Sequence, residues 1–296
     1  MKCAFIYNPH SGKCKQAKTA DYIVERLKTK YDEVDVFPTE YAGHAPILAR
    51  NTCGKYPLLV VAGGDGTLNE VVNGIAEEPD KPRLGYIPLG TVNDVGHSLK
   101  LSKNLKKAMD NILNGRVFKH DIFKVNERYG VYVCCAGIFT ETSYATKQKS
   151  KKKMGKVAYA LHAVKKMFTT PSFNIKLTFD GGEVATRAAF MMILNSRNVA
   201  SFGVNRKAKL DDGLVDVMII KEKRKRVSLR SLLHLEELFL FGLSKCKRGV
   251  RLRLSNFRVE LDEDTIVNVD GERAGQGSFD LKVIKQGLDI IVGKKF

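Results

Sequence analysis

Residues 63–67 combine, in one short turn, the residue types that bind phosphate and metal ions, reading Gly-Gly-Asp-Gly-Thr. Five apolar residues, 58–62, precede the turn, and after it apolar residues recur at the spacing of one helix face. These patterns predict a buried strand, a turn and a helix. Amides at a helix N-terminus lack intrahelical partners and lie at the positive end of the dipole, and glycine lets the backbone approach a ligand. The turn therefore favours a bound phosphate group.

Asp65 adds a carboxylate to this turn. A carboxylate that faces a polyphosphate repels it unless a cation lies between them, and Mg²⁺ is the natural mediator. Asp65 alone has a second explanation, because aspartate also caps helix N-termini.

Two further turns carry similar residues. Residues 7–13 read YNPHSGK after the first predicted strand, and residues 88–99 read PLGTVNDVGHSL after the fourth, with Asn93 and Asp94. In a parallel sheet, the turns that follow the strands emerge at the carboxyl edge, where such folds bind ligands. Three turns of this chemistry at one edge are hard to explain as helix caps, so the sequence predicts a phosphate-binding site there.

The first 120 residues alternate between short apolar runs and helical patterns. This alternation predicts a doubly wound, mainly parallel sheet with helices on both faces. Gly115 closes the last of these helices, and Ser102 is its expected N-cap. The expected strands are 3–9, 33–37, 58–62 and 84–88, and the expected helices are 16–31, 45–53, 68–76 and 104–115.

After residue 120 the sequence changes to a series of strand-like segments, with helical patterns only near 158–168 and 228–242. Several segments alternate apolar with polar residues, which predicts an antiparallel β-sandwich. We therefore expect an α/β domain over 1–120 and a β-rich domain over 121–296. A ligand is expected in the cleft between these domains.

The chain carries a net charge of +18 over 296 residues. Such an excess attracts polyanions, namely nucleic acid, an anionic membrane face or a phosphorylated substrate. Basic runs cover 147–153, 221–226 and 245–253, and solvated loops are an equal alternative for each of them. Zinc-finger, RRM and basic-zipper signatures are all absent from the sequence, so we expect no nucleic-acid partner.

Cysteine usage and hydropathy predict where the protein works. The six cysteines form no C-x-x-C pair and no cluster at zinc spacing, which favours buried thiols in a reducing cytoplasm. The start of the sequence lacks the apolar stretch of a secretory signal, and no apolar run approaches the ~18 residues that span a bilayer. We expect a cytoplasmic protein.

Five motifs lie along the chain, namely NPHSG (8–12), GGDGTLNEVVNG (63–74), PLGTVNDVGHSL (88–99), KLDDGLVDV (209–217) and VDGE (269–272). Together they resemble the diacylglycerol kinase catalytic-domain family, and in particular the bacterial soluble lipid kinases, relatives of sphingosine and ceramide kinases. The resemblance covers nearly the whole chain and the motifs fall in the family's order. The glycine turn alone is shared with NAD kinases, so the combination carries the resemblance.

The resemblance implies an ATP site at the turns described above. Asp65 would help to organise a catalytic Mg²⁺ and the triphosphate, and Asp94 and Asp121 match further family acids near the domain junction. For these two, capping or a structural ion pair is an equal alternative. The implied ATP-binding residues are Asn8, Pro9, His10, Ser11, Gly12, Thr39, Gly64, Asp65, Gly66, Thr67, Leu68, Asn69, Glu70 and Thr91.

The resemblance also implies a metal loop and a proton acceptor in the second domain. Asp212 would supply a carboxylate, and Lys209 and Leu214 backbone carbonyls, which a hard cation accepts readily. A polar turn before a strand is the alternative. Glu272 matches the family's proton acceptor and therefore its catalytic base, although the sequence alone does not separate it from Asp270. The chain departs from the family after the Asn-Asp motif, where residues 95–97 read Val-Gly-His instead of an aromatic residue and an arginine.

The sequence therefore predicts an ATP- and Mg²⁺-dependent lipid kinase that converts diacylglycerol to phosphatidic acid at an anionic membrane surface. The basic runs would dock the enzyme, and the segment 154–168 is either an interfacial helix or a core helix. Other lipids, such as phosphatidylglycerol or a sphingoid base, are alternative acceptors. An NAD kinase relative and a non-catalytic nucleotide-binding regulator are further alternatives, and edge-to-edge pairing of the second domain would allow a homodimer.

Overall fold

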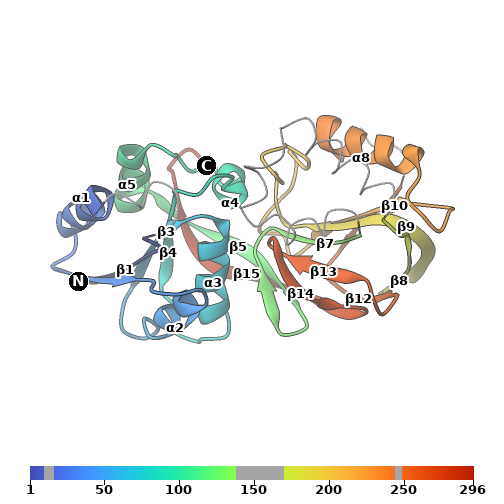
Figure 1. Cartoon of the computed structure of the whole chain (residues 1–296). Helices are drawn as coiled ribbons and strands as arrows, with labels where there is room; N and C mark the ends of the chain where they lie inside the picture. The colour runs from blue at the N-terminus through green and yellow to red at the C-terminus, as the bar shows by residue number, and fades with distance from the viewer. Residues whose placement is uncertain (10–16, 138–169, 244–248) are drawn as a thin grey trace.

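A computed structural model describes residues 1–9, 17–137, 170–243 and 249–296 (Figure 1). Its N-terminal half contains a parallel sheet with the strand order β2-β1-β3-β4. Every residue of the third strand is buried, as expected for a strand that is covered on both faces. The strands are β1 (Lys2–Tyr7), β2 (Glu33–Pro38), β3 (Leu58–Gly63) and β4 (Arg83–Pro88).

Helices cover both faces of this sheet, which confirms the predicted doubly wound arrangement (Figure 1). On one face, α2 (His44–Arg50), α3 (Asp65–Ile75) and α4 (Asp94–Ser98) share a core with the strands. On the other face, α1 (Ala17–Lys28) and α5 (Leu105–Asn114) build a second core. The apolar stripe predicted after the glycine turn is fully buried at Leu68, Val71, Val72 and Ile75.

The two ends of α5 test the predicted caps. Its N-cap is Asn104, whose side chain accepts a hydrogen bond from the Lys107 amide at 3.1 Å. The prediction of Ser102 is therefore wrong, because the Ser102 hydroxyl instead accepts from the Asn104 amide, outside the helix. The prediction of Gly115 as the closing residue is confirmed. A side chain there would lie 2.2 Å from the Val292 carbonyl oxygen.

Antiparallel strands dominate the second half and confirm the predicted β-sandwich. Their inner faces enclose one hydrophobic core, and α8 (Leu229–Phe241) covers a further cluster on the outside (Figure 1). The strands are β5 (Arg116–Val125), β6 (Arg128–Gly130), β7 (Val133–Gly137), β8 (Phe173–Phe179), β9 (Gly182–Leu194), β10 (Val215–Lys221), β11 (Val250–Leu254), β12 (Asn256–Leu261), β13 (Ile266–Val269), β14 (Glu272–Gln276) and β15 (Phe279–Val292).

Strand β15 connects the two halves. Its first residues pair with β12, most of its length from Leu281 to Val292 pairs with β5, and Ile290 lies opposite Leu84 of β4. The described strands therefore form one continuous sheet. The expected boundary at residue 120 lies within β5, so the division into 1–120 and 121–296 stays a prediction.

Some predicted features lie outside the described residues, namely the helix near 158–168, the basic run 147–153 and residues 245–248 of the last basic run. Among the helices that are described, none has the length and apolar content needed to cross a bilayer.

Candidate active site

The turns after β3 and β4 lie against each other at the carboxyl edge of the parallel sheet. The Leu89 and Gly90 amides both donate to the Gly63 carbonyl, at 2.8 and 3.2 Å. A side-chain carbon at Gly90 would lie 2.5 Å from the Cα of Gly64, so only glycine permits this approach. The predicted convergence of these two turns is therefore built from direct backbone contact.

The N-terminus of α3 leaves donors for a ligand. Gly64 is the N-cap and contributes no side-chain hydrogen bond. The first bond of the helix runs from the Leu68 amide to the Gly64 carbonyl. Within the described part of the chain, no acceptor is bonded to the amides of residues 65–67. These amides point along the helix axis at its positive end, which is the geometry that attracts phosphate.

Asp65 is the first residue of α3, yet it caps a different helix. Its carboxylate accepts hydrogen bonds from the Asp94 and Val95 amides, at 2.9 and 3.2 Å, at the start of α4. Burial raises the pKa of Asp65, and these amide donors oppose the rise. Asp65 therefore does cap a helix N-terminus, as the capping alternative supposes. The helix that it caps is α4, which follows β4, and not α3, which follows β3.

Asp94 joins this edge to the second half of the molecule. It is buried, and its carboxylate accepts hydrogen bonds from the amides of Ala200 and Ser201, at 2.6 and 2.8 Å. Both of these loop residues have a positive φ, 51° and 70°, a conformation that the two bonds help to hold. Burial raises the pKa of Asp94 as well. Of the two alternatives for Asp94, capping of backbone amides is the one observed.

Asp270 is a structural residue. Its fully buried carboxylate accepts hydrogen bonds from the amides of residues 131–133 and from the side chain of Asn69 on α3, at 2.7–3.0 Å. Burial raises its pKa to about 6, against the opposing effect of these donors. Asp270 therefore fastens the loop after β6 to α3.

Glu272 differs from Asp270 in its exposure and in the groups that it contacts. Its side chain is 48% exposed, and its Oε2 atom forms an ion pair with Arg128 at 2.5 Å. Its Oε1 atom faces α3, because a side-chain carbon at Gly66 would lie 4.0 Å from it. The structure thus separates the two acids that the sequence leaves equivalent, and it brings Glu272 to the glycine turn.

Arg128 and Tyr132 are polar residues of this site that the sequence analysis misses. Arg128 also approaches the Asn69 side chain, at 3.4 Å. Burial, with nearby Asp270, Asp65 and Asp94, raises the pKa of the Tyr132 phenol strongly. Neither residue belongs to a motif, and Arg128 is separated from Glu272 by 144 positions, so a local pattern could not have found the pair.

The remaining predicted ATP residues follow the same edge. Asn8 and Thr39 follow β1 and β2, and their amides donate to carbonyls of the neighbouring strands. The Leu68 side chain lies in the core, so only its backbone could meet a nucleotide. Thr67 is buried, Pro9 and Glu70 are partly exposed, and Thr91 is exposed. His10, Ser11 and Gly12 lie outside the described residues.

Residues 95–97, where the sequence departs from the family motif, are packed against neighbouring elements. Val95 lies in the core beneath α3. A side-chain carbon at Gly96 would lie 2.9 Å from Pro88, which leaves room for no larger residue without a shift. His97 is partly exposed on α4. Residues 95–97 therefore fit this helix tightly against the end of β4.

The predicted metal loop is held by Asp121. The buried carboxylate of Asp121 accepts hydrogen bonds from the amides of Gly213 and Gln286, both at 2.6 Å, and burial raises its pKa. Asp121, like Asp94, therefore caps backbone amides. Asp212 accepts from the Leu214 amide at 3.1 Å and forms an ion pair with Arg253.

This loop offers a carboxylate and backbone carbonyls, which are oxygen donors of the type that a hard cation binds. In the part of the chain that is described, no group of three or more acidic, histidine or cysteine side chains is arranged to hold a metal ion. A metal at this loop would therefore depend on the carbonyls of Lys209 and Leu214, and Arg253 is the group that neutralises Asp212 here.

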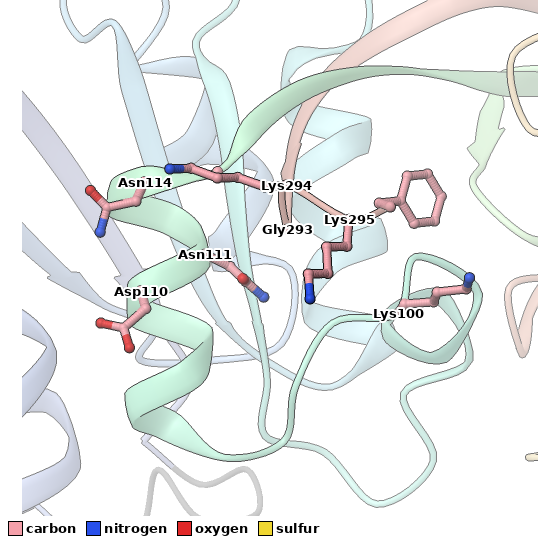
Figure 2. Close-up of a pocket in the computed structure, with 9 residues that line it drawn as sticks. Lys100, Asp110, Asn111, Asn114, Gly293, Lys294 and Lys295 are labelled. Carbon is pink, nitrogen blue, oxygen red and sulfur yellow. The ribbon is translucent and has the colours of Figure 1, made fainter.

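A well-formed pocket elsewhere contains none of the predicted site residues. It has a volume of about 470 Å³ and lies between α5 and the C-terminus, with Lys100, Asn111 and Lys295 around it (Figure 2). This pocket is therefore separate from the candidate site.

Comparison with known proteins identifies the class. Residues 2–125 match the diacylglycerol kinase catalytic domain family, and residues 133–292 match the family described as YegS C-terminal NAD kinase beta sandwich-like domain. A diacylglycerol kinase of Staphylococcus carnosus is 32% identical over 296 residues, covering 99% of this chain and 95% of that protein. One of Staphylococcus saprophyticus is 34% identical over 293 residues, covering 98% and 94%.

A solved structure agrees on the fold. The crystal structure of a diacylglycerol kinase from Bacillus anthracis superposes with a TM-score of 0.81 at 23% identity, covering 98% of this chain and 96% of that one. The resemblance noted in the motifs is confirmed by these matches over the whole chain. The chain belongs to the diacylglycerol kinase family, and its class of enzyme is that of the lipid kinases.

Proposed function

We propose that this protein transfers the γ-phosphate of ATP to the hydroxyl of diacylglycerol, forming phosphatidic acid, and that it requires Mg²⁺. The observation that carries the proposal is the position of Glu272, whose Oε1 atom faces Gly66 at the N-terminus of α3. A carboxylate from the second half therefore lies beside amide donors from the first half. Phosphoryl transfer to an alcohol needs such a pairing of phosphate alignment with a proton acceptor.

The carboxyl edge of the parallel sheet would hold the nucleotide. Amides of residues 65–67 at the start of α3 would bind phosphate oxygens, and the contact between Gly64 and Gly90 fixes the two turns that flank them. Asp65 and Asp94 brace this edge through backbone amides, so the donors are oriented before a ligand arrives. The predicted set from Asn8 to Thr91 would line the rest of the nucleotide.

Glu272 would act as the general base. Its Oε2 atom is held by Arg128, which orients the carboxylate and leaves Oε1 on the side of α3. A lipid hydroxyl that enters at this junction would lose its proton to Oε1 while its oxygen attacks the γ-phosphate in line. Arg128 acts through Glu272 and is therefore a positioning residue.

Two groups of oxygen donors are available for Mg²⁺. Asp65 would contribute beside the triphosphate, and Asp212 with the carbonyls of Lys209 and Leu214 would hold a cation in the second half. Bound Mg²⁺ supplies neutralisation of phosphate charge during transfer. We further propose that the enzyme works in the cytoplasm at an anionic membrane surface, and that a homodimer is one form it can take.

The test uses labelled ATP with diacylglycerol, phosphatidylglycerol, a sphingoid base and NAD as acceptors, the lipids in mixed micelles. Wild-type enzyme is compared with Glu272→Gln and with Asp65→Asn, which keeps an acceptor for the α4 amides. Labelled phosphatidic acid from the wild type, strongly reduced in Glu272→Gln, supports the proposal. Labelled NADP would replace it with the NAD kinase alternative, and nucleotide binding without any labelled product would favour the non-catalytic regulator.

A further inference from the structure

Helix α8 has apolar residues on two opposite sides. Its inner side, including Leu235 and Leu238, is buried against the outer face of the β-sandwich. On its outer side, Leu229, Leu233 and Leu240 are 61%, 55% and 54% exposed. A surface helix of a folded domain ordinarily presents polar residues outward, so the fold itself does not account for these three leucines.

These leucines form one stripe. Their spacing of four and then seven residues places them on the same side of a helix with 3.6 residues per turn. Glu236 lies between them on that side and is the one acidic interruption of the stripe among the residues described. Phe202 extends the apolar area, since it is 46% exposed and its ring packs edge-on against Phe239 at 5.7 Å. Exposed apolar side chains gathered on one helix in this way are typical of an interaction site.

Cations surround the first turn of the same helix. Six exposed lysines and arginines lie within residues 221–230, and in the described structure none of them forms an ion pair. Several line a pocket of about 580 Å³ beside Leu229. The six are Lys221, Lys223, Arg224, Lys225, Arg226 and Arg230.

Glu222, the one acid of this segment, does not neutralise these cations at the surface. It is buried, and its carboxylate accepts hydrogen bonds from the amides of Lys223, Arg224 and Ser228 and from the Ser231 hydroxyl, at 2.7–3.0 Å. Although burial opposes ionisation, these bonds hold its pKa at about 2. Glu222 thus fixes the basic segment against the start of α8.

The same surface borders the candidate active site through one loop. Phe202 directly follows Ala200 and Ser201, whose amides bind the carboxylate of Asp94 at the junction. A surface in contact with Phe202 is therefore only a few residues of chain from the edge proposed to hold the phosphates. The far end of α8 is attached to this loop as well, because the Leu243 amide donates to the Val204 carbonyl at 2.7 Å.

We propose that the α8 face, meaning Phe202, Leu229, Leu233 and Leu240 together with the six cations of 221–230, docks the protein on an anionic lipid bilayer. The leucines and Phe202 enter the headgroup region while the cations bind lipid phosphates. Charge decides the occupant, because a stripe of leucines beside six unpaired cations matches an anionic interface. The inference rests on the proposed function, since a lipid kinase must reach a substrate dissolved in that bilayer.

Co-sedimentation of the full chain with vesicles tests the proposal. Vesicles of phosphatidylcholine alone are compared with vesicles that also contain phosphatidylglycerol, and only the latter are expected to bind strongly. Leu229→Gln/Leu233→Gln should weaken binding by about tenfold or more, since two partly exposed leucines no longer enter the interface. Lys223→Gln/Lys225→Gln should weaken it by roughly fivefold per charge at low salt. The matched controls are Ile47→Gln on α2 and Lys106→Gln/Lys107→Gln on α5, which should bind as the wild type does.

Equal vesicle binding by the wild type and Leu229→Gln/Leu233→Gln would overturn the proposal. So would a loss of self-association in light scattering without a loss of vesicle binding, because the stripe would then pack against a second copy. A water-soluble, short-chain diacylglycerol separates this test from that of the proposed function. Docking variants should phosphorylate it normally, whereas failure of the wild type on this substrate would count against the kinase reaction itself.

Discussion

The junction between the two halves and the α8 face differ in how completely their groups are satisfied within the protein. At the junction, Asp94 and Asp270 are buried and bonded to backbone amides from distant segments. On the α8 face, the leucines are more than half exposed, and the cations form no ion pair in the described structure. A preorganised site needs its supports fixed in advance, whereas a docking surface is completed only by what it binds. The two regions should therefore respond differently to substitution.

The largest effect is expected when Glu272 is replaced, because Glu272 is the residue at the junction that is proposed to take part in the reaction. Loss of a positioned general base typically costs on the order of 10²–10⁴ in rate. Glu272→Gln should lower kcat by about that factor on both vesicles and short-chain diacylglycerol, with its midpoint of thermal unfolding nearly unchanged. Steady-state kinetics on the two substrates checks this. Arg128→Lys, a conservative control, should raise KM less than it lowers kcat.

Asp270 sharpens the contrast with Glu272, two positions away. Asp270→Ala would leave buried amides of residues 131–133 without an acceptor, and breaking such a network costs about 3–5 kcal/mol of folding free energy. Denaturant unfolding should show this loss, with Glu272→Ala, the same kind of substitution two positions away, as the matched control. An Asp270→Ala protein as stable as the wild type would mean that this carboxylate does not hold the junction together.

His120 gives the fold a pH dependence. It is fully buried in β5, which lowers its pKa from 6.5 to about 4. The unfolded chain therefore takes up the proton first as pH falls, so the stabilising neutral form is complete above pH 6.5 and the unfolding free energy declines toward pH 4. The decline is on the order of 3 kcal/mol. Unfolding measured across this range should be flatter in His120→Gln, and parallel curves for both proteins would contradict the assignment.

The smallest effect is expected on the α8 face. With short-chain diacylglycerol, Leu229→Gln/Leu233→Gln should match the wild type, because the reacting groups are untouched. With anionic vesicles, its activity at limiting lipid should fall by about tenfold, in parallel with binding. The ratio of the activity on vesicles to the activity on short-chain diacylglycerol shows whether the substitutions affect membrane docking without affecting the reaction. An equal loss on both substrates would show that α8 supports the site itself.

Local patterns were enough to predict much of this molecule. The buried run of β3, the helical stripe of α3 and the glycine turn between them are each visible within twenty residues of sequence, because backbone and burial preferences act over that length. The convergence of turns at one sheet edge followed from the parallel topology.

Long-range partners were beyond such patterns. That Asp65 caps α4 depends on how close two glycine turns approach, and that Arg128 holds Glu272 depends on the packing of strands far apart in sequence. The sequence predicts a helix near 228–242, but the helical period alone does not tell which of its two apolar sides is buried. Burial and partner geometry decide these points.

Gly66 offers the most direct test of the central claim, that the start of α3 holds the phosphates while Glu272 receives the proton. A side chain fits there, because the nearest described atom beyond the neighbouring residues and backbone of its own helix, Glu272 Oε1, would lie 4.0 Å from its first carbon. Alanine in place of glycine should stabilise the helix by roughly 0.5–1 kcal/mol. Gly182→Ala, with ordinary contacts to Phe179 at 3.7 Å, is the matched control.

The measurement is ATP binding by calorimetry for Gly66→Ala and Glu272→Gln beside the wild type. We expect Gly66→Ala to fold stably but to bind ATP at least about tenfold more weakly, because the added methyl group stands where phosphate must approach the amides. Glu272→Gln should bind ATP as the wild type does and fail only in transfer. Unchanged ATP affinity and turnover in Gly66→Ala would contradict the account.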